Sequence, residues 1–241
     1  MSFVRSFVTT LIVAGGLAAS GVAQAHSSIS SGPAQATKSQ KITVSVGHGC
    51  EDAAMKHLDT VKVRVTIPEG VTSVRALRSD FGKPTVVRNG TTVTHVEWTK
   101  PAAELLDGDD AYYELTIRAR VGDVAFSRLQ FNVEQTCEDS TTGDQVVVNW
   151  DQPPGSTTGN PAPLLTVVPP RVPGWNKYTI PAGTTVAADD FGTYFGDAVI
   201  VWRGTAAFSS NSITMTQIGA TAGVTVLGSS LAADDEIYVK Y

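Results

Sequence analysis

The sequence predicts an all-β protein: an antiparallel β-sandwich of immunoglobulin-like or cupredoxin-like type, followed by a small C-terminal α+β module. Two observations predict the sandwich. Apolar and polar residues alternate along several short segments between residues 41 and 150, which is the period of a half-buried strand, and turn residues separate these segments. A third observation, a stretch rich in Pro, Gly, Ser and Thr at 151–173, predicts a linker after the sandwich.

The first 25 residues have the composition of a secretory signal peptide. Arg5 precedes the apolar run FVTTLIVAGGLAASGVA, which leads into the small-residue tripeptide Ala23-Gln24-Ala25, a signal-peptidase site. The run is interrupted by threonines and glycines and is short for a bilayer span of roughly 20 residues. We expect residues 1–25 to be removed and the mature chain to be periplasmic or secreted. The alternative is an uncleaved anchor.

The strands of the sandwich are predicted by alternation and by turn chemistry. KITVSV at 41–46 and TVKVRVTI at 60–67 alternate strictly, so each should bury one face. Within 84–98, Asn89-Gly90 lies between two β-rich runs and predicts a hairpin, because both residues tolerate a positive φ. Further strands are predicted in the segments YYELTIRAR, VAFSRLQFNVEQ and QVVVNW, which lie between residues 112 and 150.

Beyond the linker, the sequence predicts a small module. Strands are expected in GWNKYTIPAG, DAVIVWRGTAAF and DEIYVKY, and short helices in DDFGTYFG and SSNSITMTQIGA, which Asp or Ser would cap. About 70 residues bury only a marginal core, so the module should need a surface to dock against. The predicted organisation is a signal peptide at 1–25, a sandwich at 26–150, a linker at 151–173 and a module at 174–241.

Composition lowers the expectation of several function classes. The 241-residue chain has a formal net charge of -5 and no cluster of Lys and Arg, so it lacks the basic footprint that nucleic-acid binding needs. No Ser-His-Asp order, phosphate-binding loop or dinucleotide fingerprint occurs, and we expect no enzyme activity. The cysteines are Cys50 and Cys137, and export favours a disulfide between them over a two-thiolate copper(I) or zinc site.

The histidine at position 26 directs the functional prediction. Cleavage after Ala25 would make His26 the first residue, whose amine and Nδ1 can close a six-membered chelate ring on one metal ion. Two nitrogen donors favour copper(II) over other divalent metals. Cleavage after Ala23 would instead leave His26 third, where amine, amides and imidazole hold copper(II) in a square plane. The alternative is that His26 follows the signal by accident.

The other candidate side chains are less specific. His48 lies between two glycines beside Cys50 and is a possible second ligand or an exposed loop histidine. His57 is expected in solvent, and His95 in solvent or beside a carboxylate of a neighbouring strand. The aspartates of LLDGDDAYY lack the spacing of an EF-hand loop and predict a turn before a strand; these are Asp107, Asp109 and Asp110.

From His26 to about Pro154 the sequence resembles the YcnI-like family of exported bacterial copper-binding domains. The matching features are the AH start after the signal, VTIPEGV at 65–71, HVEWT ending at Thr99, YYELTIRARV at 112–121, VVVNW at 146–150, and HGC at 48–50, which is similar to a cysteine-bearing subgroup. The ordered set is fairly specific and covers rather more than half of the mature chain.

The resemblance implies a copper(II) site on an immunoglobulin-like sandwich. Its ligands would be the N-terminal histidine and a nearby acidic side chain, with a tryptophan close to the metal. His26 matches the first position and Trp150 matches the tryptophan of the closing strand. Glu51 is the best placement for the acidic ligand, and Asp52 is the second.

The leading hypothesis is therefore an exported copper(II)-binding protein that acts in copper homeostasis or as a metallochaperone. Its partners would be the copper ion and other periplasmic copper-handling proteins or a membrane copper transporter. One alternative is an oxidative copper enzyme with a histidine brace, which needs a second histidine such as His48 or His95 near His26. The other is a metal-free envelope or adhesion module.

Overall fold

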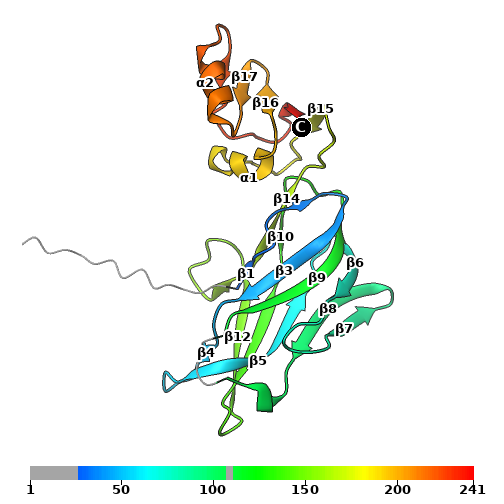
Figure 1. Cartoon of the computed structure of the whole chain (residues 1–241), viewed down its shortest axis with the longest axis vertical. Coiled ribbons are helices and arrows are strands. Elements are labelled where there is room, and N and C mark those ends of the chain that lie inside the picture. The colour runs from blue at the N-terminus through cyan, green and yellow to red at the C-terminus, as the bar shows by residue number, and fades with distance from the viewer. Residues whose placement is uncertain (1–26, 107–110) are drawn as a thin grey trace, which may run out of the picture.

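The computed structural model describes residues 27–106 and 111–241, and within them it confirms a β-sandwich followed by a smaller module (Figure 1). The strands of the sandwich are β1 (Ser28–Ile29), β2 (Ala34–Gln35), β3 (Ser39–Val46), β4 (Cys50–Glu51), β5 (His57–Thr66), β6 (Val71–Ala76), β7 (Thr85–Asn89), β8 (Thr92–Thr99), β9 (Tyr113–Val121), β10 (Arg128–Gln130), β11 (Val133–Glu138), β12 (Gln145–Gln152), β13 (Asn160–Pro161) and β14 (Leu164–Val168). A 3-10 turn, η1 (Ala102–Glu104), follows β8.

Two sheets form the layers of the sandwich. One has the order β1-β3-β9-β6, and the other has the order β13-β12-β11-β5-β8-β7, with β4 paired beside β5. The strands β10, β14 and β2 form a small third sheet at the end nearest the module. The pairings along the two main sheets are antiparallel, except that β13 runs parallel to β12. The immunoglobulin-like class predicted from the sequence is confirmed.

The alternation in the sequence accounts for the core between the sheets. Val61, Val63 and Val65 of β5 are buried, while Lys62 and Arg64 between them are partly exposed. In β9 the inward positions from Tyr113 to Val121 are buried in the same way. Burying aliphatic side chains from both sheets supplies the main driving force for this layer packing.

The predicted hairpin is present, with its turn shifted by one residue. Asn89 pairs with Thr92, so Gly90 and Thr91 form the turn between β7 and β8. Gly90 has a φ of 59°, and a turn with a positive φ at its first central residue favours glycine there.

The linker predicted at 151–173 is wrong over much of its length. Strand β12 continues to Gln152, and β14 pairs with both β10 and β2. Leu165 and Val167 of β14 are fully buried in the sandwich core. The Pro- and Gly-rich residues 153–159 form a surface loop, and their composition concealed the apolar strand that follows. The sandwich therefore extends past residue 150 to Val168.

The C-terminal module combines one sheet with two short helices. Its elements are β15 (Trp175–Thr179), η2 (Ala188–Asp190), α1 (Phe191–Phe195), β16 (Ile200–Arg203), β17 (Ala206–Phe208), α2 (Ser212–Ala220), β18 (Thr225–Val226) and β19 (Glu236–Lys240), with the sheet order β15-β19-β16-β17-β18. Both helices were predicted, but the cap of α2 is Asn211, whose Oδ1 accepts from the amides of Ile213 and Thr214. Among the described residues, no helix is long and apolar enough to cross a membrane.

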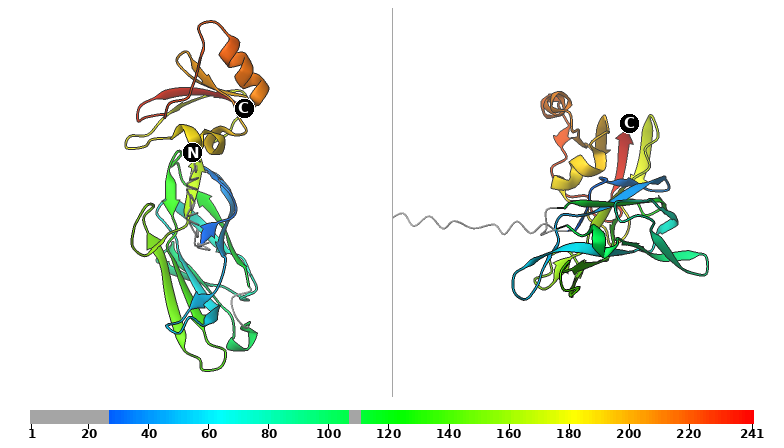
Figure 2. Two further views of the ribbon diagram at one scale, coloured as in Figure 1. Left: turned by 90° about the vertical axis from the view of Figure 1, so that its left-hand side faces the viewer. Right: turned by 60° about the horizontal axis from the view of Figure 1, so that its bottom comes forward.

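The module docks on the sandwich through an aromatic anchor, as its small core requires. Figure 2 shows the module at one end of the sandwich, with α1 facing it. Phe126, in the loop between β9 and β10, is buried in the module's core. Its ring centroid lies 5.8 Å from that of Tyr194 and 6.2 Å from those of Tyr178 and Phe195. The module therefore shares part of its core with the sandwich through Phe126.

We predict that Phe126→Ala loosens this docking. Truncating a buried phenylalanine removes its apolar contacts and leaves a cavity, which costs about 3–5 kcal/mol. Chemical denaturation should show a lower free energy of unfolding, and limited proteolysis should cut between the two parts sooner. Trp175→Ala is the matched control, because it removes a large ring that is mostly exposed. Equal stability of the two variants would contradict the anchoring role of Phe126.

Candidate metal centre

The chain enters the sandwich beside strand β3. His26 and the predicted signal peptide lie outside the described residues, as do Asp107, Asp109 and Asp110. Ser27, the first described residue, is 4 % exposed, and its Oγ donates to the carbonyl oxygen of Ser45 at 3.1 Å. Ser28 pairs with Ser45 in the β1–β3 ladder. The described chain therefore begins close to the end of β3. That strand ends at Val46, two residues before His48.

A buried glutamine organises the polar groups at this end of the sandwich. Gln135 of β11 is 1 % exposed, and its Oε1 accepts a hydrogen bond of 3.2 Å from Trp150 Nε1. Its Nε2 donates to the carbonyl oxygen of His48 at 2.8 Å and to Thr60 Oγ1 at 2.9 Å. A buried amide left without its hydrogen bonds lowers the stability of the folded state. Gln135 therefore holds the strand that carries Trp150 against the loop that carries His48.

His48 is presented toward Trp150 by the loop between β3 and β4. The two rings meet edge to face, with centroids 6.4 Å apart and planes at 72°. His48 Nδ1 contacts the carbonyl oxygen of Gly49. A carbonyl can only accept a hydrogen bond, so this contact favours the tautomer with its proton on Nδ1, in which Nε2 has the lone pair. His48 can therefore act as a metal ligand through Nε2.

The predicted disulfide is formed and anchors the same loop. Cys50 and Cys137 are bonded, with their Cα atoms 5.8 Å apart. The bond lies in a small apolar cluster with Leu58, beside Val146 and Val148. No free cysteine occurs among the described residues, so the thiolate metal site considered from the sequence is excluded. The bridge ties the loop of His48 to β11, the strand of Gln135.

Glu51 and Trp150, the two predicted partners of His26, lie in different environments. Trp150 is buried in the sandwich core. Glu51 is half exposed, and its Oε1 lies 3.7 Å from Nδ1 of His57, its partner across the β4–β5 pair. Since Cys50 points inward to the disulfide, the alternation of β4 turns Glu51 the other way. The structure thus brings His48 to Trp150 and places Glu51 with His57.

Asp52 is engaged in the turn that links β4 to β5. Its Oδ1 accepts from the amides of Ala54 and Lys56, at 2.8 and 2.9 Å. An aspartate that bonds the backbone two and four residues on stabilises a turn. Asp52 therefore has a structural function, which leaves Glu51 as the better carboxylate candidate.

His95 is separate from this cluster. It lies on β8, where its Nδ1 is 3.5 Å from a guanidinium nitrogen of Arg64 and 3.2 Å from Thr94 Oγ1. Burial, followed by the positive charge of Arg64, lowers the pKa of His95 below its ordinary value. The sequence predicts solvent or a carboxylate of a neighbouring strand beside His95; the residue is partly exposed, and its Nδ1 lies beside Thr94 and Arg64.

The described residues alone do not make a complete metal site. In residues 27–106 and 111–241, no group of three or more His, Cys, Asp and Glu side chains is arranged to hold a metal ion. Sequence reasoning missed Gln135, although the alternation of β11 places it on the same inward face as Val133 and Cys137.

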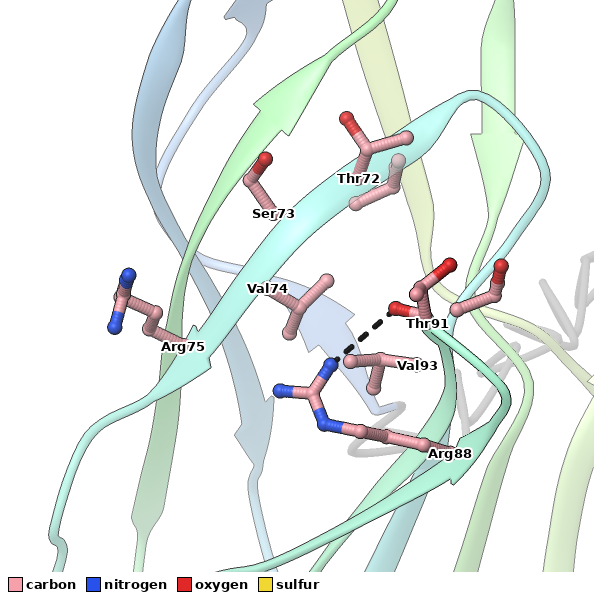
Figure 3. A pocket seen from close by; sticks show the side chains of 9 residues that line it. Thr72, Ser73, Val74, Arg75, Arg88, Thr91 and Val93 are labelled. Carbon is pink, nitrogen blue, oxygen red and sulfur yellow. Dashed lines mark hydrogen bonds between the residues drawn. The ribbon is translucent and has the colours of Figure 1, made fainter.

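A surface groove lies elsewhere on the sandwich, away from His48 and Trp150. The groove, of about 400 Å³, lies between β6 and the β7–β8 hairpin and is lined by residues 71–75, Arg88 and residues 91–93; Figure 3 shows these side chains. Arg88 donates to the carbonyl oxygen of Thr91 at 3.5 Å. The groove contains none of the predicted metal ligands.

The sandwich is similar to known proteins. Residues 26–167 match the family described as "Domain of unknown function (DUF1775)". An uncharacterized protein from Nocardia farcinica with an immunoglobulin-like fold is 26 % identical, with a TM-score of 0.47; the match covers 59 % of this chain and 97 % of that chain. No curated protein matches the chain.

Two surface proteins are more distant in sequence. Domains D2 and D3 of the major pilin SpaD from Corynebacterium diphtheriae are 11 % identical, with a TM-score of 0.37, over 89 % of this chain and 72 % of that chain. The fimbrial adhesin FimA of Actinomyces is 15 % identical, with a TM-score of 0.34, over 87 % of this chain and 73 % of that chain.

We predict that Gln135→Met destabilises the sandwich although it nearly preserves side-chain volume. The change removes the acceptor of Trp150 Nε1 and the donor to Thr60, and each buried polar group deprived of its partner costs about 1–3 kcal/mol. Denaturant unfolding measures the loss. Gln145→Met is the control, because Gln145 is exposed on neighbouring β12. If both variants unfold at the same denaturant concentration, Gln135 does not organise this end.

Proposed function

We propose that this chain, which belongs to the DUF1775 family, is an exported protein that binds copper(II) at the end of the sandwich where His48 and Trp150 meet. The observation that carries the proposal is this ring contact, held by Gln135 beside the entry of the chain at Ser27. It brings an imidazole and a buried indole together, and the chain reaches the neighbouring strand β3 at Ser27, the residue that follows His26.

The covalent chain limits where a metal held by His26 can lie. His26 is joined directly to Ser27, whose side chain is bonded to β3. One residue of extended chain spans at most about 3.6 Å. A copper ion chelated by the amine and Nδ1 of His26 therefore stays near this end of the sandwich, because the anchor at Ser27 leaves little chain to move.

Each residue of the proposed centre has a distinct role. His26 supplies two nitrogen donors, which must lose their protons before they bind, so affinity falls as pH is lowered. Trp150 shields the ion from solvent with its buried indole. Glu51 is the proposed carboxylate and would exchange its contact with His57 for the ion, and His48 Nε2 is an additional nitrogen ligand. The donor set is rich in nitrogen, which suits copper(II).

Export is part of the proposal. The Cys50–Cys137 disulfide supports it, because structural disulfides persist in oxidising compartments and are rare in the cytosol. Signal cleavage would also free the amine of His26. We propose a role in copper homeostasis or as a metallochaperone, with exported copper-handling proteins or a membrane copper transporter as partners.

The contact between His48 and Trp150 also gives a second candidate function a specific basis. A histidine brace needs a second imidazole near His26, and His48 is the described histidine beside Trp150. That reading predicts a redox product that is lost in a His48→Ala variant. If the chain is instead a metal-free envelope module, a copper titration should show no binding and the melting temperature should stay unchanged. Copper that binds the native state should raise the melting temperature.

We predict that one alanine inserted before His26 abolishes tight copper(II) binding. The insertion converts the α-amine of His26 into an amide and breaks the chelate ring. Outer-shell changes already cost about 10–100-fold in metal affinity, so losing a ligand should cost at least about 100-fold. Titration followed by electron paramagnetic resonance should give one nitrogen-rich equivalent for the correctly processed chain. Equal affinity of the extended chain would sink the proposal.

A second titration identifies the carboxylate. We expect Glu51→Gln to weaken copper(II) binding about tenfold or more, because a metal ligand contributes at least as much as an outer-shell group. Glu69→Gln is the matched control, since Glu69 is exposed in the turn between β5 and β6. Asp52→Asn tests the second candidate. An unchanged affinity in Glu51→Gln would remove Glu51 from the site.

A further inference from the structure

A lysine and an aspartate are buried together between the two sheets, outside the candidate metal centre. Lys100 follows β8 directly and is 4 % exposed, and Asp59 of β5 is 2 % exposed. Lys100 Nζ lies 2.5 Å from Asp59 Oδ2. Taking two opposite charges out of water costs several kcal/mol per ion, so this pair needs an explanation beyond ordinary surface ion pairing.

Aromatic rings enclose the lysine end of the pair. Lys100 Nζ lies 4.6 Å from the ring centroid of Tyr113 and 5.4 Å from that of Phe81. The two rings pack edge to face, 4.9 Å apart. Tyr113 comes from β9 of the facing sheet, and its hydroxyl lies 2.6 Å from Lys100 Nζ. The amine is thus confined by the fold, with little freedom to move away from the carboxyl group.

Both oxygens of Asp59 are held by donors other than Lys100. The Tyr113 hydroxyl and the amide of Thr60 donate to Oδ1, at 2.8 and 2.7 Å. The amide of Leu106 donates to Oδ2 at 2.8 Å. Burial and the hydrogen bond to Asp59 raise the pKa of Tyr113 well above its ordinary value, so the phenol keeps its proton. Fixed donors at Oδ1 are suited to stabilise negative charge that develops there.

We propose that Lys100 and Asp59 condense into an intramolecular amide cross-link. The ammonium gives one proton to Oδ2, and the neutral amine attacks Cγ. The tetrahedral intermediate carries its negative charge on Oδ1, where Tyr113 and Thr60 donate. A second amine proton passes to the Oδ2 hydroxyl, which leaves as water while Oδ1 reforms the carbonyl. One C–N bond forms and one C–O bond breaks; nothing is oxidised or reduced.

Two physical effects favour this reaction in the folded chain. Condensation replaces two buried charges by a neutral amide, which removes the desolvation cost of the pair. The fold also holds the amine against a carboxylate oxygen of Asp59, which turns an encounter between two groups into a unimolecular step. The cross-link would join positions 41 residues apart and lie within the ring closed by the disulfide, whose cysteines are 87 residues apart. It would tie β5 to the residue that follows β8, its neighbour in the same sheet, and so resist separation of these two strands.

The mass of the purified, correctly processed chain tests this inference. After reduction of the disulfide, we expect the intact protein to be lighter than its sequence by one water molecule. Tryptic digestion should yield a branched peptide that joins residues 57–62 to residues 89–118, because Pro101 protects the bond after Lys100. The full sequence mass with separate peptides would show an ion pair only and would overturn the proposal.

The chain provides an internal control for the same digest. Lys177 and Glu236 are also 2.5 Å apart, but about half exposed, and their peptides should remain separate. Lys100→Arg should have its full sequence mass, because the guanidinium is not a nucleophile here. Asp59→Asn should reach the wild-type product by releasing ammonia instead of water. The wild-type mass is decisive even if a variant fails to fold.

Discussion

The buried amide of Gln135 must satisfy both of its polar ends inside the sandwich, and this requirement determines the geometry around it. Its oxygen holds the indole of Trp150, and its nitrogen holds the loop of His48 and the hydroxyl of Thr60. The disulfide ties the same loop to the same strand. Two independent constraints therefore fix one end of the sandwich, where an exposed loop would otherwise be free to move.

The opposite end of the sandwich is constrained by apolar packing instead. The side chain of Phe126, from the loop between β9 and β10, packs in the core of the C-terminal module. The strand β14, which precedes the module, is itself fully integrated in the small sheet with β10 and β2. The chain therefore passes from one core to the next with only a short connection between Val168 and Trp175.

The sequence was sufficient to predict what depends on local pattern. Strict alternation predicted β3 and β5, and Asn89-Gly90 predicted the hairpin, because period and turn chemistry are written in neighbouring residues. The sequence was insufficient to predict contacts between residues that are far apart along the chain. Strand β14 was hidden behind a Pro-rich loop, and the contacts of Gln135 and of Lys100 join residues that only the fold brings together. His48 was a candidate, but its contact with Trp150 could not be seen in the sequence.

The polar end that Gln135 and the disulfide constrain lies beside a chain terminus that signal cleavage would expose. We propose that copper(II) lies there, between His26 and Trp150. X-ray diffraction from copper-loaded crystals of the processed protein, collected at the copper absorption edge, measures this directly. We expect one anomalous peak within bonding distance of the His26 amine and imidazole and adjacent to Trp150. A peak beside another side chain, or none in copper-soaked crystals, would contradict it.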